Sequence, residues 1–129
     1  MLYLNKPFFN QFCHKTVSRA LAEVGRHIKP GITTRELNDI AEKFIRDNGA
    51  VPAFLGYQGY PASACISVNE QVVHGIPSDY VIKEGDIVSV DLGTFMKGFN
   101  GDSAYTFAVG EVDDEVRRLL EVTKEALYK

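Results

Sequence analysis

The chain has 129 residues, 45% of them hydrophobic, which is enough to bury one core and suggests a single globular domain. Its 14 basic and 17 acidic residues give a formal net charge of -3 and form no basic stripe, which argues against nucleic acid as a partner. The only two cysteines, Cys13 and Cys65, stand in unrelated contexts, so no disulfide framework is expected and a reducing, cytoplasmic environment fits. No apolar run approaches the ~20 residues of a membrane helix, so no membrane partner is expected.

Two amphipathic helices are predicted at the start of the chain. Apolar residues recur at helical spacing over 17–28, and a Pro-Gly pair at 30–31 stops the pattern. In the second helix, Thr33 and Glu36 form a capping box ahead of another apolar face, and Gly49 provides the stop. This second helix is the better marked of the two.

Strands are expected in the middle of the chain, after an ordered loop at 51–63 that is rich in glycine, proline and aromatic residues. The β-type runs lie at 65–68, 71–74, 87–94 and 102–109. The last two are expected to form a hairpin. A third helix begins near Asp113 and has no stop signal before the chain ends, which is typical of a fragment of a longer domain.

An aspartate pair is the main candidate for chemistry. A hairpin centred between Met96 and Lys97 would place Asp91 directly opposite Asp102, with Cβ atoms roughly 4.5–5.5 Å apart. Like charges at that range repel, and a divalent cation would compensate; such a pair can also bridge two cations. The alternative is that each aspartate is an exposed strand-end or turn residue.

His74 follows a predicted apolar strand and precedes Gly75 and Pro77, which fix the backbone direction. In an amide-cleaving site, its imidazole could donate a hydrogen bond to the substrate amide or to the tetrahedral intermediate. The alternative is a core histidine whose hydrogen bonds are satisfied within the protein.

A group of aromatic and sulfur-containing residues lies in and just after the glycine-rich loop. The group comprises Phe54, Tyr57, Tyr60 and Cys65. Its composition suits an apolar pocket, and packing beneath a long loop would explain it equally well. Cys65 on its own is read as a small buried hydrophobe, because no partner that would activate it as a nucleophile is visible.

Six short motifs follow one another along the chain: LGYQGYP (55–61), CISVNE (65–70), HGIP (74–77), EGDIV (84–88), VD (90–91) and GDS (101–103). Together they make a region of about residues 29–109 that resembles type I methionine aminopeptidases. The resemblance implies an α+β structure, half of a pita-bread (creatinase/aminopeptidase) fold, with an antiparallel sheet and helices on one face. Residues 1–129 would be the amino-terminal part of this catalytic domain.

The resemblance also implies a function: removal of the initiator methionine from nascent proteins by a cytoplasmic metallo-aminopeptidase with two divalent ions. It makes Asp91 and Asp102 metal ligands and His74 a catalytic residue that contacts the substrate. It places Phe54, Tyr57, Tyr60 and Cys65 in the pocket for the methionine side chain. It assigns a monovalent cation to Asn69 and the backbone of Gln71. Cobalt, manganese, iron and zinc suit such mixed ligands comparably.

The family's remaining ligands, a histidine and two glutamates, would belong to a second half after Lys129. The chain alone is therefore expected to bind metal weakly and to turn over slowly or not at all. Two copies are expected to pair through the surface that the second half would cover. Two alternatives are a non-catalytic pita-bread binding module and a prolidase-like peptidase. The combination of Asp91, Asp102 and His74 argues against the first, and the short amino-terminal region argues against the second.

Overall fold

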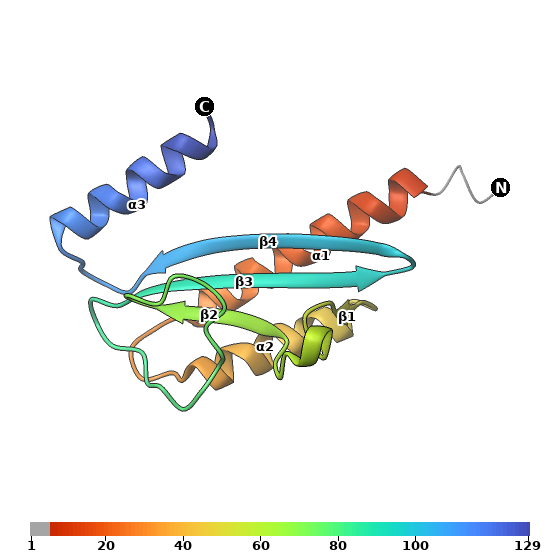
Figure 1. Ribbon diagram of the computed structural model, residues 1–129, viewed down its shortest axis with the longest axis horizontal. Coiled ribbons are helices and arrows are strands. Elements are labelled where there is room, and N and C mark those ends of the chain that lie inside the picture. The colour runs from red at the N-terminus through yellow and green to blue at the C-terminus, as the bar shows by residue number, and fades with distance from the viewer. Residues whose placement is uncertain (1–5) are drawn as a thin grey trace.

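The computed structural model describes residues 6–129, with side chains from residue 11 onward. Its elements, in chain order, are α1 (Lys6–His27), α2 (Thr34–Asp47), β1 (Val51–Pro52), the short 3-10 helix η1 (Tyr57–Gly59), β2 (Ala64–Val68), β3 (Ile87–Met96), β4 (Phe99–Ala108) and α3 (Asp114–Leu127). Figure 1 shows the strands as one layer, with α1 crossing behind β3 and β4.

The strands form one antiparallel sheet in which β3 pairs with all the others. β4 pairs along the whole of β3, from Ile87↔Ala108 to Met96↔Phe99. β2 and the short β1 share the other edge of β3 (Figure 1).

Helices α1 and α2 cover one face of this sheet, so the core is a layer between two helices and four strands. It consists mainly of branched aliphatic residues: Val17, Val24, Leu37, Ile45, Ile66, Val88, Val90 and Leu92. Glycine permits a close helix–sheet approach, since a Cβ at Gly25 would lie 2.6 Å from Cε1 of Phe107. The predicted α+β architecture with helices on one face is confirmed.

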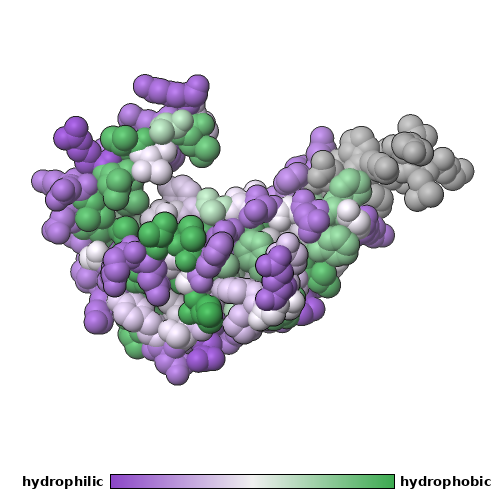
Figure 2. Space-filling view, in the orientation of Figure 1, coloured by the Kyte–Doolittle hydropathy of each residue, from purple (hydrophilic) through white to green (hydrophobic). Residues whose placement is uncertain are grey.

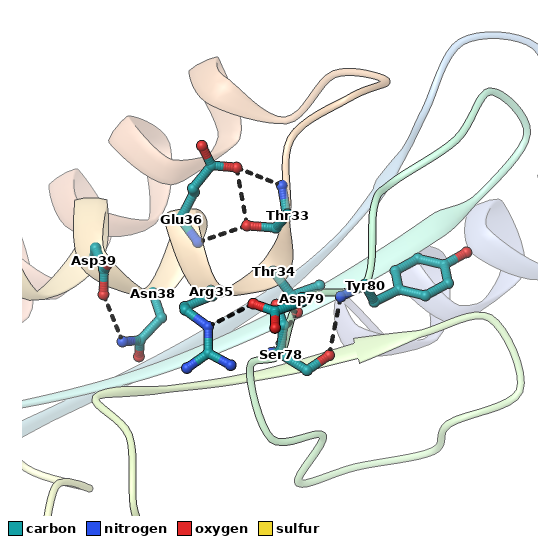
Figure 3. Close-up of polar contacts among 9 residues, drawn as sticks. All are labelled: Thr33, Thr34, Arg35, Glu36, Asn38, Asp39, Ser78, Asp79 and Tyr80. Carbon is teal, nitrogen blue, oxygen red and sulfur yellow. Dashed lines mark hydrogen bonds and ion pairs between the residues drawn. The ribbon is translucent and has the colours of Figure 1, made fainter.

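The amino terminus of α2 has the predicted capping box (Figure 3). The Thr33 hydroxyl accepts a hydrogen bond from the Glu36 amide at 3.1 Å, and the Thr33 amide donates to Glu36 Oε2 at 2.8 Å. Gly49 takes a left-handed φ of 79° just after the helix, as a stop residue does. α1 begins at Lys6, earlier than the apolar pattern at 17–28 indicated.

The predicted strand at 71–74 is wrong. The Gln71 amide donates to the Val68 carbonyl, and the Gln71 side chain accepts from the Val68 amide at 3.0 Å. These bonds close a turn that directs the chain away from the sheet. As a result, Val72 is 85% exposed and Val73 is 64% exposed. Two adjacent valines favour a strand locally, but the turn leaves them no strand to pair with.

The predicted hairpin is confirmed, but its register is not the one expected. Lys97 and Gly98 form the turn with φ values of 49° and 86°, the double left-handed conformation of a two-residue hairpin turn. Asp91 therefore pairs with Ala104, and Asp102 pairs with Gly93. The two aspartates are diagonal neighbours on one face. The prediction that they lie directly opposite each other is wrong.

Helix α3 forms where it was predicted, but none of its residues is buried. It projects from one end of the sheet (Figure 1). Within residues 6–129, no helix combines the length and the apolar character needed to cross a membrane.

Candidate metal centre and substrate pocket

The candidate site lies on the sheet face that the helices leave uncovered. Side chains alternate between the two faces of a strand, and paired residues share a face. Cys65, Asp91 and Ala104 form one row across β2, β3 and β4, and Asp102 lies in the next row, opposite Gly93. Val90 and Leu92, on the other face, are fully buried beneath the helices. Alternation therefore places both aspartates on the open face.

Asp91 is partly buried, and its surroundings disfavour the charged form. Burial and the negative charge of Asp102 raise the pKa of Asp91 to about 6, whereas His74 acts in the opposite direction. In the part of the chain that the structure describes, Asp91 Oδ1 is the one buried side-chain oxygen or nitrogen that lacks a hydrogen-bond partner. A buried carboxylate oxygen without a donor is costly unless a ligand or cation meets it.

His74 lies in the loop between β2 and β3, with an exposed side chain and a left-handed φ of 60°. Such a conformation is uncommon for residues other than glycine, although asparagine, aspartate and histidine adopt it more often than the rest, and strained backbone of this kind clusters at functional sites. Because His74 influences the pKa of Asp91, its ring lies within electrostatic reach of that carboxylate. The structure thus brings His74 and the aspartate pair into one region.

Three of the four predicted pocket residues also gather on this face. The Phe54 ring packs against Gly93, where a Cβ would lie 2.5 Å from its Cε1. Cys65 is only 7% exposed and pairs with Asp91, and burial raises the pKa of its thiol. Tyr60 lies close to Cys65. The pKa of the Tyr60 hydroxyl is raised, mainly by burial and secondly by the Cys65 thiol.

Tyr57, the fourth, differs from the others. It lies on the short helix η1 and is 67% exposed, and its hydroxyl accepts a hydrogen bond from the adjacent Gln58 side chain. The described residues therefore supply no packing that fixes Tyr57 against the aspartates.

Asn69 and Gln71 lie at the start of the loop that carries His74. The Asn69 side chain donates to Asp86 Oδ1 and accepts from the Ile87 amide, both at 3.0 Å. These bonds close the loop and occupy one lone pair of the Asn69 side-chain oxygen. A cavity of about 280 Å³ adjoins Asn69 and Gln71. Its other lining residues include Thr34, Ile66, Val68, Ser78 and Tyr80.

The likeness to known proteins extends along almost the whole chain. Residues 11–129 match the metallopeptidase family M24. The chain belongs to this family. Methionine aminopeptidase 1 of Bacillus subtilis (strain 168) is 55% identical over 107 residues, which are 83% of this chain and 43% of that protein.

Solved structures agree with this assignment. The methionine aminopeptidase of Rickettsia prowazekii superposes with a TM-score of 0.90 at 38% identity, over 97% of this chain and 51% of that one. The prolidase from Pyrococcus furiosus gives a TM-score of 0.80 at 28% identity, over 91% of this chain and 33% of that one. The M24 chain thus has half of the pita-bread fold and spans about half the length of the relatives it matches, or less.

The open face fits the divalent metal ions that an M24 metallopeptidase implies. It offers two carboxylates on one face, and one buried oxygen has no donor. Among the described residues, however, no group of three or more histidine, cysteine, aspartate or glutamate side chains could hold a metal ion. Asp91 and Asp102 are thus the candidate ligands that the described part of this M24 chain brings together.

Two features of the site were not anticipated from the sequence. Gly93 makes room for Phe54, and the Ser67 hydroxyl accepts a hydrogen bond from the Gly75 amide at 3.0 Å. An isolated glycine within a strand pattern does signal the close approach of another group, so Gly93 carried a usable signal. Ser67 carried none.

Proposed function

We propose that this chain is the amino-terminal half of a cytoplasmic methionine aminopeptidase, an enzyme that removes the initiator methionine from nascent proteins. The observation that carries the proposal is the aspartate pair on the open face, with Asp91 Oδ1 buried and lacking a donor. Relatives named methionine aminopeptidase, at 46–55% identity, support the choice of substrate.

Asp91 and Asp102 would hold the divalent ions, and carboxylates of this kind suit cobalt, manganese, iron and zinc. When bound, such ions lower the pKa of a water molecule and polarise the scissile carbonyl. The family resemblance assigns the remaining ligands, a histidine and two glutamates, to a second half, and one glutamate would be the general acid and base. The chain alone should therefore bind metal weakly and show little or no turnover.

The residues around the aspartates would handle the substrate. Phe54, Tyr60 and Cys65 would contact the methionine side chain and exclude water from it, because they gather beside the aspartates on the open face. Tyr57 would join them by moving from its exposed position on η1. His74, within electrostatic reach of Asp91, would donate a hydrogen bond to the substrate amide.

A monovalent cation would bind through Asn69 and the backbone carbonyl of Gln71. The bonds from the Asn69 side chain to Asp86 and Ile87 support this arrangement, since they fix the backbone of the turn. The cation would therefore reinforce the start of the loop that carries His74.

Complementation tests the proposal. The chain is mixed with the separately produced carboxy-terminal half of the Bacillus subtilis relative, and release of methionine from a Met-Ala-Ser peptide is measured with added Mn²⁺. Turnover is expected only when both halves are present, and Asp91→Asn/Asp102→Asn should abolish it. The matched control is Asp113→Asn/Asp114→Asn, which makes the same charge change at the exposed start of α3 and should retain turnover.

Calorimetric titration with Mn²⁺ completes the test. Binding to the chain alone should be weak and should disappear in the aspartate double variant. Binding that survives in this variant would overturn the metal assignment. Complemented protein that hydrolyses Xaa-Pro dipeptides but releases no methionine from Met-Ala-Ser would favour a prolidase-like enzyme. Metal binding without any hydrolysis would favour a binding module.

Two copies of the chain would associate through the surface left open around α3. Leu119, Val122 and Leu127 are 59%, 53% and 79% exposed, and Figure 2 shows apolar surface where α3 projects from the sheet. Strand β4 adds a long edge that pairs only with β3 among the described strands. A strictly monomeric species in light scattering at high protein concentration would contradict this.

A further inference from the structure

Beyond its hydrogen-bonded turn at Asn69 and Gln71, the loop carrying His74 meets the sheet again at Gly75, which is buried although its neighbours His74 and Ile76 are exposed. The Gly75 amide donates to the Ser67 hydroxyl at 3.0 Å, and the Gly75 carbonyl accepts from the Ile66 amide at 2.8 Å. Both partners belong to β2. Gly75 thus adds a single residue of strand-like pairing beside the edge of the sheet.

Only glycine fits this position. A Cβ at Gly75 would lie 2.2 Å from the Ile66 carbonyl oxygen and 2.9 Å from the Ser67 Cα. Both contacts are with backbone, which cannot rotate away as a side chain can. Gly75 therefore lies directly against β2, and its position determines where the next residue upstream, His74, is placed.

Tyr60 comes from a different loop, between β1 and β2, and joins the same point. Its single hydroxyl proton lies between two acceptors, the Ala64 carbonyl at 2.8 Å and the Gly75 carbonyl at 3.2 Å, and is shared by them. The Tyr60 ring is half-buried. One phenol thus ties the first residue of β2 to the His74 loop.

His74 itself needs such support. Its left-handed φ of 60° is an unfavourable conformation for a residue with a side chain, and it persists only where the surroundings fix it. The ring is exposed, so packing of the side chain does not supply the constraint. The hydrogen bonds at Gly75 are the adjacent constraint on the backbone.

We propose that Tyr60 and Ser67 are positioning residues: through their hydrogen bonds to Gly75, they hold His74 in its left-handed conformation beside the aspartate pair. The catalytic relevance of this role rests on the function proposed above. The structural claim does not, because it concerns the backbone of residues 74–75. It also gives the Tyr60 hydroxyl a task other than contact with a methionine side chain.

Nuclear magnetic resonance on the isotope-labelled protein tests the proposal without an activity assay. A left-handed residue gives an unusually strong cross-peak between its own amide and α protons, because φ near +60° brings them together. Tyr60→Phe should weaken this signal at His74. It should also speed hydrogen exchange of the Gly75 and Ile66 amides about three- to tenfold, the effect of losing one hydrogen bond.

Ser67→Ala is the second variant, and it should act on the same two amides, because it removes the acceptor for the Gly75 amide. Tyr105→Phe is the matched control: it deletes a phenol hydroxyl elsewhere on the sheet and should change neither readout. Exchange of the Ala50 amide, which donates to the Ile45 carbonyl at a distant helix end, reports any general loss of stability. It should stay constant in all three variants.

An unchanged His74 signal and unchanged exchange at Gly75 in both Tyr60→Phe and Ser67→Ala would overturn the proposal. Equal acceleration at Gly75 and Ala50 would also overturn it, because the hydroxyls would then stabilise the whole fold and not this loop. Failure of the complementation assay would refute the proposed function and leave this result standing.

Discussion

The features of Asp91 that favour the proposed metal binding should also destabilise the metal-free fold. Its Oδ1 is buried without a partner in the described chain, and Asp102 adds a like charge on the same face. Asp91→Asn should therefore raise the Tm of the metal-free protein at pH 7.5 by about 3–5 °C, since it removes one of two neighbouring negative charges. Thermal unfolding in EDTA, followed by circular dichroism, measures this.

The same variant should lose the response to metal. A large excess of Mn²⁺ should raise the Tm of the unsubstituted protein, because a ligand that binds only the folded state stabilises it. It should leave Asp91→Asn unchanged. A variant less stable than the unsubstituted protein in EDTA would show that Asp91 has a structural role instead.

The identity of the site residues was more predictable than their geometry. Asp91 stood out because it interrupts the apolar run at 87–90, and the structure places it beside Asp102 on the open face. Its relation to Asp102 depended on the turn, and Lys97 adopts a left-handed φ of 49° that the sequence pair Lys-Gly signals weakly compared with Asn-Gly. The backbone conformation of His74 was equally unpredictable. It depends on the hydrogen bonds that Gly75 makes with Tyr60 and Ser67, which lie elsewhere in the chain.

Among the elements, α2 depends on its first turn. There the Thr33 hydroxyl accepts a hydrogen bond from the Glu36 amide, and the Glu36 carboxylate accepts one from the Thr33 amide (Figure 3). Thr33→Ala should lower the free energy of unfolding by about 1 kcal/mol, the usual effect of losing an N-cap. Urea titration measures this. Thr123→Ala is the control, because the Thr123 hydroxyl donates to the Leu119 carbonyl within helix α3. It should change the free energy of unfolding by less than about 0.5 kcal/mol.

The loop between β2 and β3 depends on Asp86, which is 7% exposed. Its carboxylate accepts hydrogen bonds from Asn69, Tyr80 and the Lys83 amide at 3.0, 2.8 and 3.0 Å. Burial opposes ionisation, but these bonds outweigh it and lower the pKa of Asp86. Asp86→Asn should therefore lower the free energy of unfolding by about 1–3 kcal/mol at pH 7. The three donors would then face a neutral amide, which has one acceptor oxygen in place of two charged ones.

This loss should depend on pH. Because the folded-state pKa of Asp86 is lowered, its stabilisation is complete above its unfolded pKa of about 4 and is lost as the pH falls through the folded value. Urea titrations at pH 7 and pH 3 should show a smaller difference between variant and unsubstituted protein at pH 3. Asp79→Asn, which removes an exposed ion pair with Arg35, should have little effect at either pH. A difference independent of pH would exclude the carboxylate charge as the cause.

An element whose own residues carry both an apolar face and end signals was predicted correctly, and one whose outcome depends on a turn at its first residue was not. The capping box and apolar face of α2 are contained within its own residues. The run at 71–74 had an apolar, β-branched composition but turns out of the sheet at Gln71, whose side chain binds the Val68 amide. Nothing in the run itself distinguishes these outcomes.

The molecule as a whole is a sheet with one face covered by α1 and α2 and the other open. Composition and periodicity predicted only an α+β domain, whereas the motif order identified half of a larger fold. The share of the relatives that the chain spans, 43% of the Bacillus subtilis protein and 51% of the Rickettsia prowazekii chain, agrees with this. We propose that the open face and the exposed α3 are related features, both covered by the second half of such a fold.

Helix α3 should contribute to association and not to folding. None of its residues is buried, so Leu119→Glu/Val122→Glu should change the free energy of unfolding by no more than about 0.5 kcal/mol. The same variant should decrease the weight-average mass in light scattering, because it places two charges on the apolar surface proposed to pair between copies. Arg118→Glu changes the net charge by the same amount at an exposed position of the helix, and it should leave the mass unchanged. A large loss of stability in the double variant would show that α3 packs on the sheet in solution, and an unchanged mass would show that association uses another surface.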